Sequence, residues 1–194
     1  MRAKYWLLIV VAATALGPVL RGADAPDATK MEQWEREMDA RRAALVGKPL
    51  VIEGRTSTGG EFSSSAYKGK VILVDFWATW CPPCQITLPE VQKAYAKYHD
   101  RGLEVIGVSC DPDEAKLNSF IKDHEMPWPQ LREESQKDEK TRWNPVATKL
   151  GVWTIPTFFL IDRNGIVSSS DLGGQFEKKV EALLAEKPAA ATQR

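Results

Sequence analysis

The 194-residue sequence has no excess charge of either sign, since 26 lysines and arginines balance 26 aspartates and glutamates. A protein that binds nucleic acid or an anionic membrane surface requires a positive electrostatic field, which this composition does not provide. We therefore expect no nucleic-acid partner. The length suffices for a single domain with short extensions.

Metal-binding residue types are also scarce, with three cysteines and two histidines in the whole chain. Outside the pair Cys81 and Cys84, the remaining ones are Cys110, His99 and His124. They form no second pair with the spacing of a four-ligand structural zinc site. Covalent haem attachment requires a histidine directly after the second cysteine, where this chain has Gln85. We expect no metal and no separate cofactor.

Long apolar runs are few, and the most prominent, over residues 7–20, is shorter than the ~20 residues that cross a bilayer comfortably. It follows Arg2 and Lys4 and leads to small residues that end at Ala25, a pattern typical of a secretory signal peptide. We expect residues 1–25 to be cleaved; the alternative is an uncleaved anchor that tethers the domain to a membrane. Both predictions place the domain in the periplasm or another extracytoplasmic compartment.

The rest of the chain alternates between helix and strand patterns. Residues 26–46 are expected to be a helical extension, with an amphipathic helix over 31–46. Residues 47–187 are expected to be the domain and 188–194 a flexible tail.

Apolar periodicity predicts the order of elements within the domain. The predicted elements are a hairpin with strands near 50–52 and 61–62, a strand over 71–77, a helix over 84–98, a strand over 103–109, a helix over 113–124, a short strand within 126–131, a charged surface loop over 133–144, a helix over 145–150, a strand over 157–162, a hairpin strand over 166–170 and a helix over 175–185. Strand, helix and strand in succession indicate parallel pairing through right-handed crossovers.

The motif that carries chemistry is Trp80-Cys81-Pro82-Pro83-Cys84, between a predicted buried strand and a predicted helix. Two cysteines at this spacing can close a small disulfide ring, and the N–H groups and dipole of the helix stabilise a thiolate on the first one. The two prolines donate no N–H and restrict the backbone, which should shift the reduction potential. We expect a redox-active pair in which Cys81 is reachable and Cys84 sheltered. A permanent structural disulfide is the alternative, although so small a ring adds little stability.

Residues 71–84, VILVDFWATWCPPC, resemble the active-site strand and turn of the thioredoxin superfamily. With the export signal, the preceding hairpin and an insertion between Asp111 and Leu150, the chain most resembles its TlpA/ResA-like branch of exported thiol-disulfide oxidoreductases. The resemblance covers residues 47–184. It implies an α/β, thioredoxin-like fold: a central mixed β-sheet flanked by helices, with an N-terminal β-hairpin extension and a central insertion.

Carried over by position, the resemblance implies that Cys81 is the attacking thiolate and Cys84 the resolving thiol. Asp75 matches a buried carboxylate whose raised pKa would let it exchange the proton of Cys84; the alternative is that Asp75 ends its strand at the surface. Pro156 matches the superfamily's cis-proline, which would expose the Ile155 backbone to an extended substrate chain.

Three further residues are interpreted with the site. Trp80, with the prolines of the motif, is expected to line the substrate-binding surface and to shield the sulfurs. Thr87 stands where the ResA-like branch often has a glutamate, which questions a specific role in cytochrome c maturation. Cys110 follows a predicted strand at the same sheet edge as the pair, either as a buried apolar residue or as a third redox thiol.

The implied function is dithiol-disulfide exchange with protein thiols and disulfides, with the domain as a reductant that a membrane-bound thiol-disulfide reductant recharges. An oxidant or isomerase is the alternative, because related pairs span about −270 to −120 mV, a range that small changes in thiolate stabilisation cover. A peroxiredoxin-like peroxidase would need a proline upstream of its cysteine, and none lies between Lys70 and Cys81. A non-catalytic copper-binding or thiol-binding module is a further alternative.

Overall fold

The computed structural model describes residues 28–137, 143–170, 172 and 176–186. The predicted signal peptide, residues 1–25, and the predicted tail, residues 188–194, lie outside these residues. Within the described part of the chain, no helix has both the length and the apolar character needed to cross a membrane.

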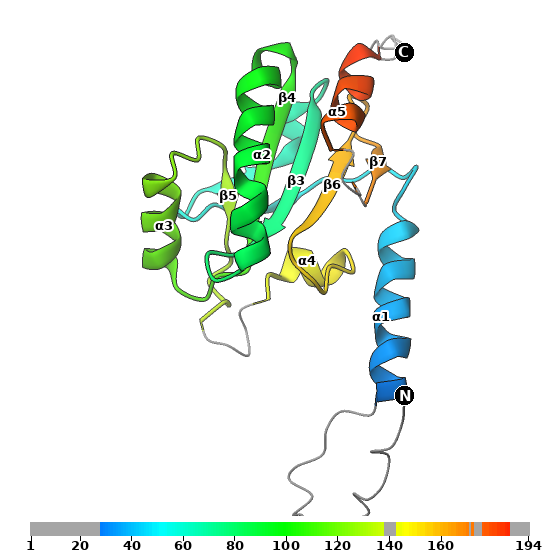
Figure 1. Ribbon diagram of the computed structural model, residues 1–194, viewed down its shortest axis with the longest axis vertical. Helices are drawn as coiled ribbons and strands as arrows, with labels where there is room; N and C mark the ends of the chain where they lie inside the picture. Colours follow the sequence, from blue (N-terminus) through cyan, green and yellow to red (C-terminus); the bar gives the residue numbers. More distant parts are fainter. Residues whose placement is uncertain (1–27, 138–142, 171, 173–175, 187–194) are drawn as a thin grey trace, which may run out of the picture.

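The centre of the domain is a five-stranded mixed sheet with the strand order β5-β4-β3-β6-β7 (Figure 1). The strands are β3 (Val71–Trp77), β4 (Leu103–Ser109), β5 (Gln130–Leu131), β6 (Thr157–Ile161) and β7 (Val167–Ser169). Strands β3, β4 and β5 are parallel, whereas β6 runs antiparallel to β3, and β7 antiparallel to β6. The predicted central mixed sheet is therefore confirmed.

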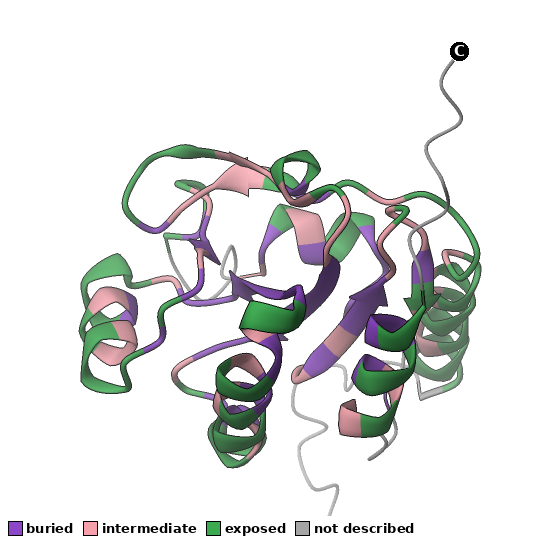
Figure 2. Cartoon of the chain, turned by 90° about the horizontal axis from the view of Figure 1, so that it is seen from above, coloured by how far each residue is buried: buried purple, intermediate pink, exposed green. Residues whose placement is uncertain are grey.

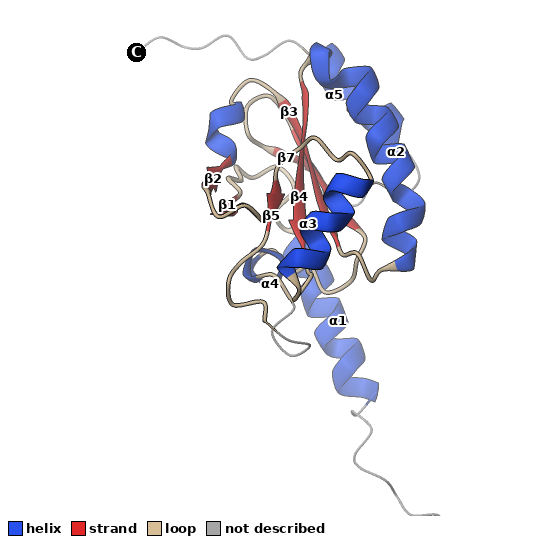
Figure 3. Cartoon of the chain, turned by 90° about the vertical axis from the view of Figure 1, so that its left-hand side faces the viewer, coloured by secondary structure: helices blue, strands red, loops and turns tan. Residues whose placement is uncertain are grey.

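Helices flank this sheet. They are α1 (Ala28–Ala43), α2 (Pro82–Tyr98), α3 (Glu114–Asp123), α4 (Pro145–Lys149) and α5 (Phe176–Ala185), with short 3-10 helices η1 (Ser64–Tyr67) and η2 (His99–Arg101). Figure 3 shows α2 and α5 on one side of the sheet and the β1–β2 hairpin on the other. Buried positions gather in the sheet and on the inner faces of the helices (Figure 2).

The two central strands form because both are runs of β-favouring residues covered on both faces. All seven residues of β3 and all seven of β4 are buried. A side chain at Gly107 in β4 would place its Cβ 1.8 Å from Oε1 of Gln130. That oxygen instead accepts a hydrogen bond from Nε1 of Trp77 at 2.9 Å. Because Gly107 has no side chain, the hydrogen bond between Trp77 of β3 and Gln130 of β5 can pass across β4.

The predicted hairpin is present, but its first strand begins later. Strand β1 (Glu53–Arg55) pairs antiparallel with β2 (Glu61–Ser63), so the prediction of a strand at 50–52 was wrong by three residues. The reason is that the preceding segment bonds to the β6–β7 hairpin: the Leu50 N–H donates to the Gly165 carbonyl at 2.9 Å, and Pro49 bridges to Ile166.

The predicted helix over 31–46 forms three residues earlier, as α1. Its expected apolar face is not buried, since Met31 is 41% and Trp34 42% exposed. The helix touches the domain through the edge-to-face pair of Trp34 and Trp153, 5.8 Å between ring centroids, and through the Met38 carbonyl oxygen beside Gly151. The prediction of an amphipathic helix was therefore wrong: helical spacing alone does not provide a surface to pack on.

The predicted charged surface loop over 133–144 contains two fully buried amides, Gln136 and Asn144. Both side chains donate to the Ser109 carbonyl oxygen, at 2.9 and 3.3 Å respectively. Buried backbone oxygens require such partners, so this segment packs against the end of β4. The prediction was wrong for these two residues, and residues 138–142 lie outside the described part.

Candidate active site

Cys81 and Cys84 form a disulfide at the start of α2, with their Cα atoms 5.3 Å apart. Cys81 is the N-cap residue, and the Cys84 backbone N–H donates to its sulfur at 3.2 Å. Pro82 and Pro83 occupy the first two helical positions and have no N–H. The amide of Cys84 is therefore the first donor of the helix, and it points at the sulfur on which a thiolate would form.

The expected contrast between a reachable and a sheltered sulfur is not present in this oxidised state, because both cysteines are only 4% exposed. The surrounding surface is open: Trp80 is 41% and Ile86 76% exposed. Trp80 thus stands out beside the pair with a large accessible area.

The bond between Ile155 and Pro156 is cis, as the resemblance implied. The Ile155 carbonyl oxygen lies 3.7 Å from the Cys81 sulfur. The loop before β6 therefore brings a backbone acceptor next to the residue expected to attack.

Asp75 lies in the middle of β3, between Gly107 of β4 and Phe158 of β6. It is 5% exposed, so the alternative that it ends the strand at the surface was wrong. Burial raises the pKa of its carboxyl to about 7, and its Oδ1 has no hydrogen-bond partner among the described residues. A carboxyl group of this kind can gain or lose a proton near neutral pH.

A second buried carboxylate, Asp111, was missed by the sequence reasoning. The Thr79 N–H donates to its Oδ2 at 3.0 Å and the Thr79 hydroxyl to its Oδ1 at 2.6 Å. The Ser109 hydroxyl donates to Oδ2 at 2.8 Å. One signal was available: Asp111 lies two residues after the strand over 103–109, at the sheet edge where the motif lies. Its neighbour Cys110 is fully buried.

A cavity of about 370 Å³ opens beside Pro156. Its walls include Thr87 and Glu90 from α2, and Arg42 from α1. The hydroxyl of Thr87 donates to the Cys84 carbonyl oxygen at 3.0 Å. Thr87 stands where the ResA-like branch often has a glutamate, and its side chain is bonded to the backbone of α2. The N-terminal helix contributes directly to a hollow next to the candidate site.

Known proteins share this arrangement of sequence and fold. The AhpC/TSA family matches residues 46–170. The thiol-disulfide oxidoreductase ResA of Bacillus thuringiensis (strain Al Hakam) is 31% identical over 178 residues, which cover 92% of this chain and 91% of the relative. The protein of the same name from Halalkalibacterium halodurans is 27% identical over 186 residues and covers 94% of each chain.

Solved structures agree with these relatives. The thioredoxin domain of a thiol-disulfide oxidoreductase from Bacteroides vulgatus superposes with a TM-score of 0.61 at 28% identity, covering 72% of this chain and 97% of that one. This likeness confirms the predicted thioredoxin-like fold. The chain therefore belongs to the AhpC/TSA family and is a thiol-disulfide oxidoreductase similar to the ResA proteins.

Proposed function

We propose that the chain reduces disulfides of protein substrates outside the cytosol, with Cys81 as the nucleophile. The observation that carries this proposal is the Cys84 amide 3.2 Å from the Cys81 sulfur at the N-terminus of a 17-residue helix. An amide donor and a helix dipole both favour the thiolate, so Cys81 is ionised more readily than an ordinary thiol.

The proposed exchange has two steps. The Cys81 thiolate attacks one sulfur of a substrate disulfide, forms a mixed disulfide and releases the other sulfur as a thiolate. Cys84 then loses its proton and attacks the Cys81 sulfur, which closes the internal disulfide and releases the second substrate thiolate. Two electrons pass from the cysteine pair to the substrate, and no cofactor beyond the pair takes part.

Asp75 is proposed to accept the proton of Cys84 in the second step. Its carboxyl is buried in the same interior as Cys84, and its raised pKa, about 7, lies close to working pH. A proton acceptor is most effective when its pKa lies near the operating pH. Its Oδ1, which no described residue contacts by a hydrogen bond, is available to receive this proton.

The substrate chain is proposed to bind as an extended segment along the Ile155 backbone, with Pro156 and the side chains of the motif around it. Trp80 and the exposed prolines, Pro82 and Pro83, offer an apolar surface next to a sulfur that is itself covered. Contact with this surface would place the substrate disulfide in line with Cys81.

The pair must be re-reduced after each cycle, and we propose a membrane-bound thiol-disulfide reductant as the source of electrons. The N-terminal sequence supports an extracytoplasmic location, and an uncleaved segment would tether the domain to the membrane. An oxidant or isomerase would use the same residues in the opposite direction, so the reduction potential decides between them.

The deciding experiment is the redox equilibrium of the purified protein against glutathione, followed by trapping. A potential near −270 mV is expected for a reductant, and one near −120 mV would establish an oxidant instead. Cys84→Ser should accumulate a mixed disulfide whose other half identifies the substrate. Cys81→Ala is the matched control: if it still reduces insulin disulfides, Cys81 is not the nucleophile.

A further inference from the structure

The loop before the disulfide is held from two directions at Thr79. Its N–H and hydroxyl both donate to the carboxylate of Asp111, at 3.0 and 2.6 Å. Its carbonyl oxygen accepts from Nε2 of Gln85, in the first turn of α2, at 2.6 Å. Thr79 therefore connects the end of β4 with the beginning of the helix, two residues before Cys81.

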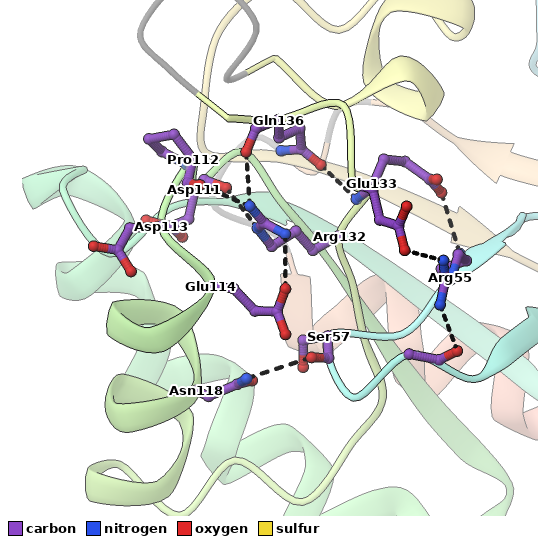
Figure 4. A network of polar contacts seen from close by, with 12 residues as sticks. Arg55, Ser57, Asp111, Pro112, Asp113, Glu114, Asn118, Arg132, Glu133 and Gln136 are labelled. Carbon is purple, nitrogen blue, oxygen red and sulfur yellow. Dashed lines mark hydrogen bonds and ion pairs between the residues drawn. The ribbon is translucent and has the colours of Figure 1, made fainter.

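Asp111 is itself fixed by the inserted segment. The guanidinium of Arg132, which is 8% exposed, donates to the backbone oxygens of Asp111, Pro112 and Gln136 at 3.1, 2.7 and 2.7 Å. It also bonds to the Glu114 carboxylate at 3.1 Å. Figure 4 shows this guanidinium at the centre of the network, between α3 and the segment after β5.

The network reaches the N-terminal hairpin as well. The Glu133 carboxylate accepts from the Arg55 N–H in β1 at 3.1 Å, and the Glu133 N–H donates to Gln136 Oε1 at 2.8 Å. Figure 4 shows these contacts on the hairpin side of Arg132. Hairpin, insertion and α3 thus form one bonded frame around Asp111.

We propose that Asp111 is a positioning residue for disulfide exchange: through Thr79 it fixes the loop that carries Cys81, so that the Cys81 sulfur stays aligned with the first amide of α2. This inference rests on the proposed role of Cys81 as the nucleophile. Asp111 is 2% exposed, and its hydrogen bonds from Thr79 are charge-assisted. Bonds of this kind are short, directional and stronger than neutral ones.

The consequence for reactivity follows from the geometry. One amide donates to the sulfur, because the two helical positions before Cys84 are prolines. A loop released from Asp111 would let the sulfur drift from that single donor, and the thiolate would lose its principal bond. Reaction rates respond steeply to such small misplacements.

Thr79→Val removes the hydroxyl donor without changing charge or size appreciably, and Thr79→Ser retains it. The readout is the pH dependence of alkylation of Cys81 in the reduced protein, together with the rate of insulin reduction. We expect Thr79→Val to slow alkylation at pH 7 about tenfold, equivalent to one unit in the pKa of the thiol, and Thr79→Ser to match the wild type. Thr56→Val, which removes a hydroxyl bonded to the Gly60 N–H in the β1–β2 turn, is the matched control and should leave the alkylation profile unchanged.

Asp111→Asn supplies a second measurement, since it retains the shape of the side chain. It should also shift the profile, while Ser119→Ala, on the exposed face of α3, should not. If Thr79→Val and Asp111→Asn fold and alkylate like the wild type, Asp111 has only a structural role and the inference is wrong. If wild-type Cys81 alkylates no faster than an ordinary thiol, the proposed function fails first, which is a separate result.

Discussion

Two aspartates lie buried near the disulfide, and they differ in what surrounds them. Asp75 is 5% exposed and Asp111 2% exposed. One carboxyl oxygen of Asp75 has no hydrogen-bond partner in the part of the chain that the structure describes, and burial raises its pKa to about 7. Burial also raises the pKa of Asp111, but hydrogen bonds from Thr79 and Ser109 oppose that shift.

The difference teaches that burial alone does not assign a role to a carboxylate. A buried carboxylate with few partners exchanges its proton readily, whereas one whose oxygens accept several hydrogen bonds holds its donors in place. We therefore interpret Asp75 as the group that moves a proton and Asp111 as the group that holds a loop.

The largest expected effect tests the titration of Asp75. Its pKa rises from 3.8 to about 7 on folding, so its contribution to the free energy of unfolding is fully present below pH 4 and is lost as the pH rises through 7. The full loss amounts to about 4 kcal/mol, of which about 3 kcal/mol falls between pH 5 and pH 8. Asp75→Asn should lack this decline, which urea unfolding of the oxidised protein at pH 5 and pH 8 would measure. If the free energy of unfolding changes equally with pH in the wild type and in Asp75→Asn, Asp75 does not titrate as expected and its contrast with Asp111 is lost.

Asp111→Ala should lower the free energy of unfolding by about 3 kcal/mol at neutral pH, because it leaves the Thr79 and Ser109 donors unsatisfied inside the protein. Asp113→Ala, two residues away, removes an exposed helix cap whose oxygen accepts from the Lys116 N–H, and should cost about 1 kcal/mol. Similar losses in the two variants, measured by urea unfolding, would contradict the role of Asp111 as an anchor.

Asp75→Asn should also slow disulfide exchange, since the amide cannot accept the Cys84 proton. General acid-base catalysis contributes at least about 100-fold in such steps, and we expect a loss of that size at pH 7. Stopped-flow fluorescence of mixed-disulfide resolution would measure it. Asp100→Asn, on the surface, is the control. A variant at position 75 with unchanged resolution would show that water takes the proton instead.

The smallest expected effect concerns a third carboxylate. Thr87→Glu would add a partly exposed acid beside the start of α2, more solvated than either Asp75 or Asp111. A negative charge near Cys81 disfavours its thiolate, so the reduction potential should shift by about 30 mV and the pKa of Cys81 should rise. Thr87→Gln, measured in the same glutathione equilibrium, separates charge from size. Identical shifts in both would exclude a charge effect.

Sequence predicted the parts of the molecule that local pattern determines. The bounds of β3 and β4 were predicted to the residue, because a run of buried β-branched residues leaves little freedom. The resemblance to the thioredoxin superfamily implied the cis bond at Pro156 and the burial of Asp75, and both are present. These features depend on short stretches of chain and on a well-marked motif.

Features that depend on distant segments were not predicted. The bond between Thr79 and Asp111 joins residues 32 positions apart, and the position of Asp111 at the sheet edge of the motif indicates its vicinity but not this bond. Gln136 and Asn144 have the composition of a surface loop, yet they are buried because the end of β4 requires donors. The apolar residues of α1 suggested packing, but the domain offers them contact mainly at Trp153 and Gly151.

Those contacts of α1 have a mechanical consequence. A 16-residue helix is a stiff rod about 24 Å long, and this one is joined at its C-terminal half to Gly151 and, through Asp39, to the Trp153 indole at 3.0 Å. These two residues lead directly into the loop that faces the sulfurs. The N-terminal helix and the backbone acceptor beside the Cys81 sulfur are therefore attached to the same short stretch of chain, residues 151–155.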